Sequence, residues 1–451
     1  MKTIFITFNT ILALFLPASI ASAVDNINNN QVTKKSLCVA ENTTKKSWDL
    51  VDANLVKTTS NSKIRSGQSL NFSQAEGNKK DIPFSSQLIA SCLPSINQTN
   101  NSNPLYSSSL CRLVRQQVVA KSPAKITNTV TNTRPPQFVL LAFDGSQSLD
   151  AWQKSRQFVK DMEKKGIFVR FTYFISGVYF VTKENRKIYN APAGKGVGRS
   201  AIGWAKSADD IQKRLEQVNL AYQEGHEIGS HAVGHFNGSN WSEADWQKEF
   251  AYFNQFIFDA YQNNNLTGNL AFDQKAIQGF RAPELGHSKG LYQTLTKQGF
   301  RYDTSKTNNI DYWPQKINQV WNFPLVSLTT AKTKKRTLSM DYNFYMAHSQ
   351  AKPNKSQAQL YEQDMFETYL QYFENNYDGN RAPIHIGHHF SEWNNGAYWR
   401  SLFRFAEVVC GRPEVKCVTY QELADFMDTL TPAQIAIYQK SDFSQKTAQQ
   451  K

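Results

Sequence analysis

The sequence predicts an α/β fold built around a parallel sheet that is either open or closed into a barrel. From residue 137 onward, apolar segments of strand length alternate with segments of helical periodicity, and such alternation is typical of βαβ units. The segment 138–143 is apolar without interruption, as expected of a strand that is buried on both faces. The distance from residue 137 to residue 430 suits one barrel-sized domain.

The boundaries of the expected elements carry recognisable signals. Gly166 ends the first helix, and Ser207 is a candidate N-cap followed by Asp209 and Asp210 in the first helical turn. The expected strands cover residues 138–143, 167–175, 226–230, 276–281, 300–303, 321–328 and 383–389, with a last strand at Val418. The expected helices cover residues 148–165, 207–225, 242–261, 291–298, 357–377, 398–409 and 420–430.

The two ends of the chain differ in composition from this central part. Residues 1–23 are expected to be a secretory signal peptide, because a basic start is followed by an apolar stretch and by Ala21-Ser22-Ala23, a small-x-small cleavage site. Residues 24–134 are rich in Asn, Ser, Thr and Lys, and we expect an irregular accessory segment there. Residues 135–430 form the expected main domain, and residues 431–451 a polar C-terminal tail.

The formal net charge of +14 favours anionic partners. The lysines are scattered, and the one dense run, at residues 332–336, is interpreted as a solvated basic loop. No nucleic-acid-binding motif accompanies these charges, so nucleic acid is not an expected partner. After the signal segment no apolar run reaches the roughly 18 residues that a spanning helix needs. The sequence therefore predicts a soluble exported protein, periplasmic or secreted.

Five cysteines follow the signal segment, and export would permit disulfides. Cys410 and Cys417 enclose a turn-like insert, so a local bridge between them is expected. Cys92 and Cys111 could form a second bridge, and Cys38 would then have no partner among the five. The sequence alone does not determine the connectivity. The spacings do not match a Cys-x-x-Cys zinc site.

Reactive side chains recur where the expected strands end. Asp144, His231, Arg281 and His389 each fall at or just after such an end, and in parallel α/β folds the chemistry lies at the carboxyl ends of the strands. His231 and His235 are four residues apart, so one turn or a tight loop can direct both imidazoles at one point. Neutral imidazole is the commonest protein ligand of zinc-like metals.

Several motifs together resemble the polysaccharide deacetylases, the NodB-type carbohydrate esterases that include chitin and peptidoglycan deacetylases. The metal motif of that family is closely matched by Gly225 to His235, and its arginine motif by Phe280-Arg281-Ala282-Pro283. The further matching segments are residues 142–145, 171–177, 299–305 and 383–389. The resemblance implies a distorted (β/α) barrel of about seven strands. It also implies the removal of acetyl groups from an N-acetylated polysaccharide such as peptidoglycan or a chitin-like glycan.

The resemblance also implies roles for individual residues. His231 and His235 are the expected ligands of a divalent metal, most naturally Zn²⁺, which lowers the pKa of bound water to about 7 and polarises the carbonyl. Asp144 corresponds to the base, and Arg281 keeps that carboxylate ionised and oriented. His389 corresponds to the acid that protonates the departing amine.

The first motif departs from the family pattern. The family has two adjacent aspartates, one as base and one as metal ligand, whereas here Asp144 is followed by Gly145. Three outcomes are open: Asp144 remains the base, Asp144 ligates the metal at least part of the time, which we favour, or the site is degenerate and binds glycans without cleaving them. A basic adhesive envelope protein is a further alternative, based on charge.

The remaining candidates near the motifs have plainer interpretations. His226 is expected to be a structural, hydrogen-bonded histidine, and His388 to pack in the wall beside His389. Glu284 and His287 could reach the cleft or lie solvated on its rim. The tryptophans that could stack on sugar rings, or belong to the core, are Trp313, Trp321, Trp393 and Trp399.

Overall fold

The computed structural model describes residues 37–42, 47–52, 88–91 and 134–444, and the chain divides into two units, residues 1–129 and 130–451. In the first unit three strands form an antiparallel sheet in the order β2-β1-β3, where an irregular segment is expected from the sequence. These strands are β1 (Leu37–Asn42), β2 (Ser47–Asp52) and β3 (Leu88–Ser91). The expected signal segment and the pair Cys92 and Cys111 lie outside the described residues.

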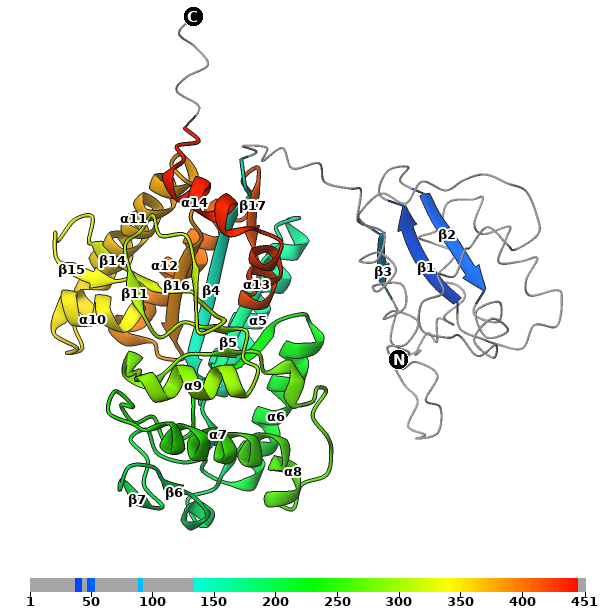
Figure 1. Ribbon diagram of the computed structural model, residues 1–451, viewed down its shortest axis with the longest axis vertical. Coiled ribbons are helices and arrows are strands. Elements are labelled where there is room, and N and C mark those ends of the chain that lie inside the picture. The colour runs from blue at the N-terminus through cyan, green and yellow to red at the C-terminus, as the bar shows by residue number, and fades with distance from the viewer. Residues whose placement is uncertain (1–36, 43–46, 53–87, 92–133, 445–451) are drawn as a thin grey trace, which may run out of the picture. The chain divides into compact units, whose positions relative to one another are not determined.

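The second unit contains a curled, mixed sheet with the strand order β12-β13-β10-β9-β8-β5-β4-β16, and β17 also pairs with β4. Figure 1 labels β4, β5, β16 and β17 of this sheet. The parallel strands are β4 (Gln137–Gly145), β5 (Phe171–Ile175), β8 (Glu227–Ser230), β9 (Gly279–Phe280), β10 (Tyr302–Asp303), β13 (Val320–Asn322), β16 (Ile384–His389) and β17 (Val415–Cys417). Strand β12 (Gln315–Ile317) joins one edge antiparallel. This half-barrel confirms the expected α/β class and distorted barrel.

The helices follow the strands much as the sequence predicts. Ser148, Ser207 and Ser242 cap the helices that follow them, each accepting a hydrogen bond from the backbone three residues on. The helices are α5 (Leu149–Lys164), α6 (Ala208–Gln223), α7 (Glu243–Phe258), α8 (Ala260–Asn263), α9 (Lys289–Lys297), α10 (Asp341–Ser349), α11 (Ala358–Tyr377), α12 (Trp393–Val409), α13 (Tyr420–Asp428) and α14 (Pro432–Lys440).

Some segments differ from the expectation. The prediction of a single strand over 321–328 is wrong. Phe323-Pro324 divides this segment into β13 and β14 (Leu325–Thr329), because proline has no N–H to continue a ladder of hydrogen bonds. Strand β14 belongs to a separate small sheet with β11 (Thr307–Asn308) and β15 (Arg336–Leu338). Helix α14 replaces the first part of the expected polar tail, and it buries Ile435 and Tyr438.

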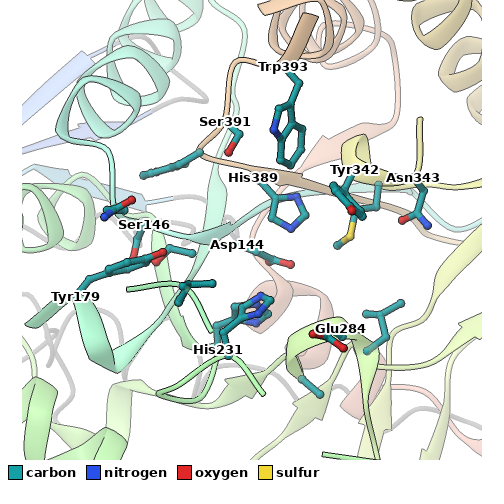
Figure 2. Close-up of a pocket in the computed structure, with 18 residues that line it drawn as sticks. Asp144, Ser146, Tyr179, His231, Glu284, Tyr342, Asn343, His389, Ser391 and Trp393 are labelled. Atoms are coloured by element: carbon teal, nitrogen blue, oxygen red, sulfur yellow. The ribbon is translucent and has the colours of Figure 1, made fainter. Parts of the chain in front are cut away.

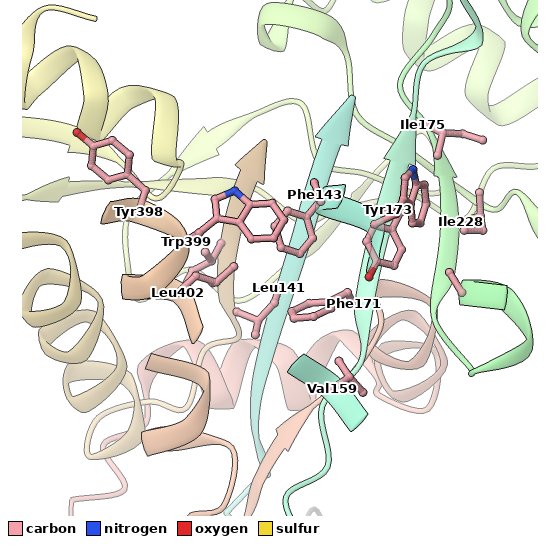
Figure 3. Packing of buried hydrophobic residues seen from close by; sticks show 14 of the residues in the cluster. Leu141, Phe143, Val159, Phe171, Tyr173, Ile175, Ile228, Tyr398, Trp399 and Leu402 are labelled. Carbon is pink, nitrogen blue, oxygen red and sulfur yellow. The ribbon is translucent and has the colours of Figure 1, made fainter. Parts of the chain in front are cut away.

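The core explains why β4 is continuously apolar. Leu141 and Phe143 belong to a cluster that includes side chains of α5 and α12, among them Trp399 (Figure 3). Leu140 and Ala142, on the alternate face of β4, belong to a second buried cluster with residues of α13. Both faces of β4 are therefore covered, as predicted.

The expected disulfide between Cys410 and Cys417 is present, with a Cα–Cα distance of 5.6 Å. It ties the end of α12 to β17, which pairs with the first residues of β4. Among the helices of the described ranges, none has the length and apolar character needed to cross a membrane.

The register of the parallel strands places their carboxyl ends, which carry the candidate site residues, side by side. His389 lies beside Asp144, Asp144 beside Phe174, and Ser230 beside both Ile175 and Phe280. The residues that follow these ends therefore emerge along one rim of the sheet.

Candidate active site

A cavity of about 640 Å³ opens at this rim (Figure 2). Asp144 contributes to its wall from the end of β4, His231 and His235 from the loop after β8, and His389 from the end of β16. Arg281 lies buried directly behind Asp144. The structure thus brings together all five residues that the sequence singles out.

Asp144 and Arg281 form a fully buried ion pair. Arg281 Nη1 donates to Asp144 Oδ1 at 2.8 Å, Nε donates to Thr304 Oγ1 at 2.5 Å, and Nη2 donates to the Tyr420 hydroxyl at 3.3 Å. Burial alone would raise the pKa of the Asp144 carboxyl, but the adjacent Arg281 guanidinium holds it below its usual value. Asp144 is therefore a carboxylate fixed in position by a guanidinium that is itself held on three sides.

The ring of His231 is oriented by the backbone. His231 Nδ1 donates to the carbonyl oxygen of Arg281 at 2.8 Å, which leaves the lone pair of Nε2 free. Burial lowers the pKa of His231 to about 3 and also lowers that of His235, so both imidazoles are neutral at physiological pH. The two ring centres lie 5.1 Å apart.

The loop between these histidines is anchored by Glu249, a fully buried residue of α7. Glu249 Oε1 accepts hydrogen bonds from the backbone N–H groups of Val233 at 2.9 Å and Gly234 at 3.2 Å. Its Oε2 accepts from the hydroxyl of Tyr189 at 2.7 Å. One side chain thus holds the backbone that connects His231 to His235, which the sequence alone did not indicate.

His389 is held by Asp341, the first residue of α10, which sequence reasoning missed. His389 Nδ1 donates to Asp341 Oδ1 at 2.7 Å, and the backbone N–H of His389 donates to Oδ2 at 2.8 Å. Burial would lower the pKa of His389, but Asp341, and more weakly Asp144, raise it above its ordinary value. Nε2 of the ring is left for the cavity, and it is a good proton donor.

The structure also decides which of the other candidate side chains reach the rim of the cavity. Trp393 lines the cavity, with its ring stacked on Tyr345 at 5.2 Å and 5.4 Å from the ring of His389. Tyr342, which is 42% exposed, also lines it. Glu284 reaches the wall as well. The other three candidate tryptophans, Trp313, Trp321 and Trp399, are buried in the core.

Three further histidines, His226, His385 and His388, are structural. His226 Nδ1 accepts from the backbone N–H of Phe171 at 3.0 Å, as expected of a hydrogen-bonded core residue. His388 is buried beside Tyr369, whose hydroxyl lies 3.3 Å from Nε2. His385 stacks against Phe323 and Tyr420 in the interior. His389 alone among the three histidines of β16 lines the cavity.

Gly145 stands where the family pattern has a second aspartate. Its φ is +98° and that of Ser146 is +76°, so the chain turns sharply as it leaves β4. A Cβ at Gly145 would meet no atom within 4 Å. The position therefore has room for a side chain, but its backbone conformation favours glycine.

The donor set fits a divalent ion held by two imidazoles. With metal–nitrogen distances of about 2.0–2.1 Å, two imidazoles on one tetrahedral ion have ring centres about 5 Å apart, which agrees with the spacing of His231 and His235. Within the described ranges, no group of three or more His, Cys, Asp or Glu side chains is arranged to hold one ion. Asp144 lies in the same cavity wall but is already paired with Arg281.

Comparison with known proteins agrees with the resemblance. Residues 131–302 match the family described as polysaccharide deacetylase, so the chain contains a domain of that family. A putative polysaccharide deacetylase from Mycobacterium smegmatis aligns at 12% identity and a TM-score of 0.41, over 66% of this chain and 96% of that one. A family 4 carbohydrate esterase from Streptomyces lividans aligns at 12% identity and a TM-score of 0.31, over 62% and 90%.

The solved structures also include a family 4 pseudoenzyme from Bacillus anthracis, at 10% identity and a TM-score of 0.34, over 65% of this chain and 67% of that one. A comparison with curated proteins gave no match.

Proposed function

We propose that the chain is an exported, metal-dependent hydrolase that removes acetyl groups from an N-acetylated polysaccharide. The observation that carries the proposal is the combination of side chains that meet in one cavity. A buried carboxylate, two neutral imidazoles and a histidine whose pKa is raised by Asp341 are all present there. The family match over residues 131–302 supports the reaction class.

In the proposed reaction the amide bond between the acetyl carbon and the sugar nitrogen is broken by water. A divalent ion held by His231 and His235 would lower the pKa of a water molecule and polarise the acetyl carbonyl. Asp144 accepts the proton of the attacking water, and Arg281 keeps the carboxylate charged and oriented for this step. His389 donates the proton on Nε2 to the departing nitrogen, so acetate and a free amine leave.

The protein environment supplies the two protonation states that this reaction requires. An ionised Asp144 and a protonated His389 must coexist, and opposite shifts of their pKa values favour that combination. The disulfide between Cys410 and Cys417 supports export to an oxidising compartment, periplasmic or extracellular.

A second candidate is a glycan-binding protein without turnover, which Gly145 favours because it removes one carboxylate from the metal set. The two functions are separated by acetate release from N-acetylglucosamine oligomers, measured with the purified full chain. The enzyme proposal requires acetate and a matching increase in free amine. A protein that binds the oligomers but releases no acetate with any added divalent metal supports the second candidate instead.

Metal removal provides a direct prediction. Treatment with a chelator should abolish acetate release, and added Zn²⁺ should restore it, because two imidazoles alone cannot polarise the amide carbonyl. With only two imidazoles and at most one carboxylate as ligands, the affinity should be weak enough for chelation to be rapid. The measurement is acetate release before chelation, after it and after readdition. Activity that survives removal of all bound metal, verified by elemental analysis, contradicts metal dependence.

Substitution of Glu249 should weaken metal binding without touching a ligand. Glu249→Ala leaves the N–H groups of Val233 and Gly234 without their buried acceptor, and loss of such outer partners typically costs about 10–100-fold in metal affinity. Glu249→Gln keeps an acceptor oxygen and should lose only a few-fold. The measurement is the Zn²⁺ dissociation constant of the folded protein.

The matched control is Glu243→Gln, at the start of the same helix, where the side chain pairs with Lys297 at the surface. Equal Zn²⁺ affinities for Glu249→Ala and the wild type would show that the loop between the histidines is held by other contacts.

A further inference from the structure

The segment between β5 and α6 carries an unusual concentration of positive charge. Its residues 183–206, named here the basic insert, include a short hairpin of β6 (Asn190–Ala191) and β7 (Gly196–Val197). The insert contains a single acidic residue, Glu184. Its cationic residues are Lys183, Arg186, Lys187, Lys195, Arg199 and Lys206. The segment therefore has a strong net positive charge.

These cations are free of carboxylate partners. Five of the six are exposed, and Arg186 is half-buried. Among the described residues none of the six forms an ion pair, whereas Lys213 and Arg214, in the next helix, pair with Asp209 and Asp210. Asp245 of α7 does face the insert, but it accepts hydrogen bonds from Ala193 and Ser242 rather than from a cation. The positive charge of the insert is therefore not neutralised within the described fold.

The insert borders the cavity on the side of His235. The backbone N–H of Ala201 donates to the carbonyl oxygen of Gly234 at 2.9 Å, and Ile202 lines the cavity. Lys195 Nζ lies 5.6 Å from the centre of the Phe236 ring, next to His235 in sequence. Of the six cations, Lys195 is therefore placed beside the loop that carries His235.

The rim beside His389 is aromatic rather than charged. Trp393 and Tyr342 line the cavity there with rings 5.4 Å apart. Aromatic faces suit the apolar face of a sugar ring, whereas exposed, unpaired cations suit carboxylates or other anionic groups. The two rims thus present different recognition chemistry to one extended ligand.

We infer that the substrate is an anionic polysaccharide, in which the acetylated sugar enters the cavity while acidic groups of neighbouring residues contact the basic insert. This inference rests on the proposed function, and it assigns the substrate class of that same site. It excludes a neutral chitin-type polymer as the preferred ligand, because such a polymer gains nothing from the charge of the insert.

The test compares two oligosaccharides of equal length with the full chain. A hyaluronan octasaccharide carries alternating carboxylates and N-acetyl groups, and a chitin octasaccharide carries N-acetyl groups alone. The hyaluronan oligomer should bind more tightly, and the difference should shrink as salt is raised, because exposed charges are screened. The triple substitution Lys187→Gln, Lys195→Gln and Arg199→Gln should weaken hyaluronan binding about ten-fold and chitin binding less than about two-fold.

The control removes the same charge elsewhere. Lys275→Gln, Lys416→Gln and Lys440→Gln change exposed lysines that lie away from the cavity, two of them on β17 and α14, and should leave both affinities unchanged. Equal losses in the two triple variants would mean that net charge alone attracts the polymer, and the inference fails. It also fails if duplex DNA of similar charge binds as tightly through the insert.

The same experiment separates this inference from the proposed function. Acetate release from the chitin oligomer without any preference for hyaluronan would overturn the inference and leave the function intact. Tight, insert-dependent binding of hyaluronan, without acetate release from any acetylated glycan, would support the inference and overturn catalysis.

Discussion

Asp144→Asn should reduce acetate release by about 10³-fold or more, because a proton-accepting carboxylate contributes about 10²–10⁴-fold to the rate. Asp144 also carries the only negative charge next to Arg281 in the described site. The amide keeps the shape of the side chain and an oxygen that can accept from Arg281, so the fold should survive. It cannot accept the proton of water. The measurement is kcat/KM for acetate release from an N-acetylglucosamine oligomer.

Stability should fall as well, because the guanidinium of Arg281 remains buried without a counter-charge. Breaking a buried ion pair on one side costs about 3–5 kcal/mol, which denaturant unfolding can measure. Asp150→Asn, an exposed position in the first turn of α5, is the matched control and should change neither activity nor stability. Turnover in Asp144→Asn close to that of the control would remove Asp144 from the chemistry.

The same variant distinguishes the two roles that Gly145 leaves open for Asp144. If the carboxylate serves only as the base, Asp144→Asn should bind Zn²⁺ as tightly as the wild type while losing turnover. If it also shares the ion with His231 and His235, the Zn²⁺ affinity should fall together with turnover. Arg281 donates to Oδ1 at 2.8 Å, so Oδ2 is the carboxylate oxygen that Arg281 leaves free for such sharing.

Much of the site could be predicted because parallel strands end at one rim. Asp144 and His389 are neighbours in the ladder between β4 and β16, although 245 residues separate them in the chain. Asp144 directly follows an apolar run, which predicts a reactive side chain at the rim. The choice of His389 over His388 comes from the family resemblance. His231 and Arg281 follow strand ends in the same way, and the hydrogen bond between them reflects the pairing of β8 with β9.

The residues that orient the site were harder to predict. Asp341 begins a helix with no strong apolar periodicity, in a stretch where no element is predicted from the sequence, and only the fold brings it to His389. Glu249 lies in a helix that was predicted, but a single glutamate among apolar neighbours looks like an exposed position until the loop after β8 is placed over it. Both carboxylates act through tertiary hydrogen bonds, which leave no periodic signal.

Asp341→Asn should shift the pH dependence of the reaction to lower pH. His389 must be protonated to donate to the leaving nitrogen, so kcat/KM falls as pH rises through the pKa of His389. Burial lowers this pKa, and Asp341 is the main group that raises it above the ordinary value. Without that charge burial dominates, the protonated fraction at neutral pH drops, and the alkaline limb of the profile should move down by about one pH unit or more. Well above the pKa each unit of this shift lowers the protonated fraction about ten-fold, so the loss there should reach about ten-fold or more.

His389→Gln is the comparison that separates a change in the pKa of the proton donor from the loss of that donor. It removes the proton donor at every pH, so its residual rate should lack this alkaline limb, whereas Asp341→Asn should recover part of its activity as the pH is lowered. An Asp341→Asn profile that superimposes on the wild type would show that Asp341 does not set the protonation of His389. A profile lowered equally at all pH values would mean that Asp341 only orients the ring, through the hydrogen bonds to Nδ1 and to the backbone N–H. The pH at which the alkaline limb falls, rather than the size of the activity loss, therefore decides whether catalysis depends on the raised pKa of His389.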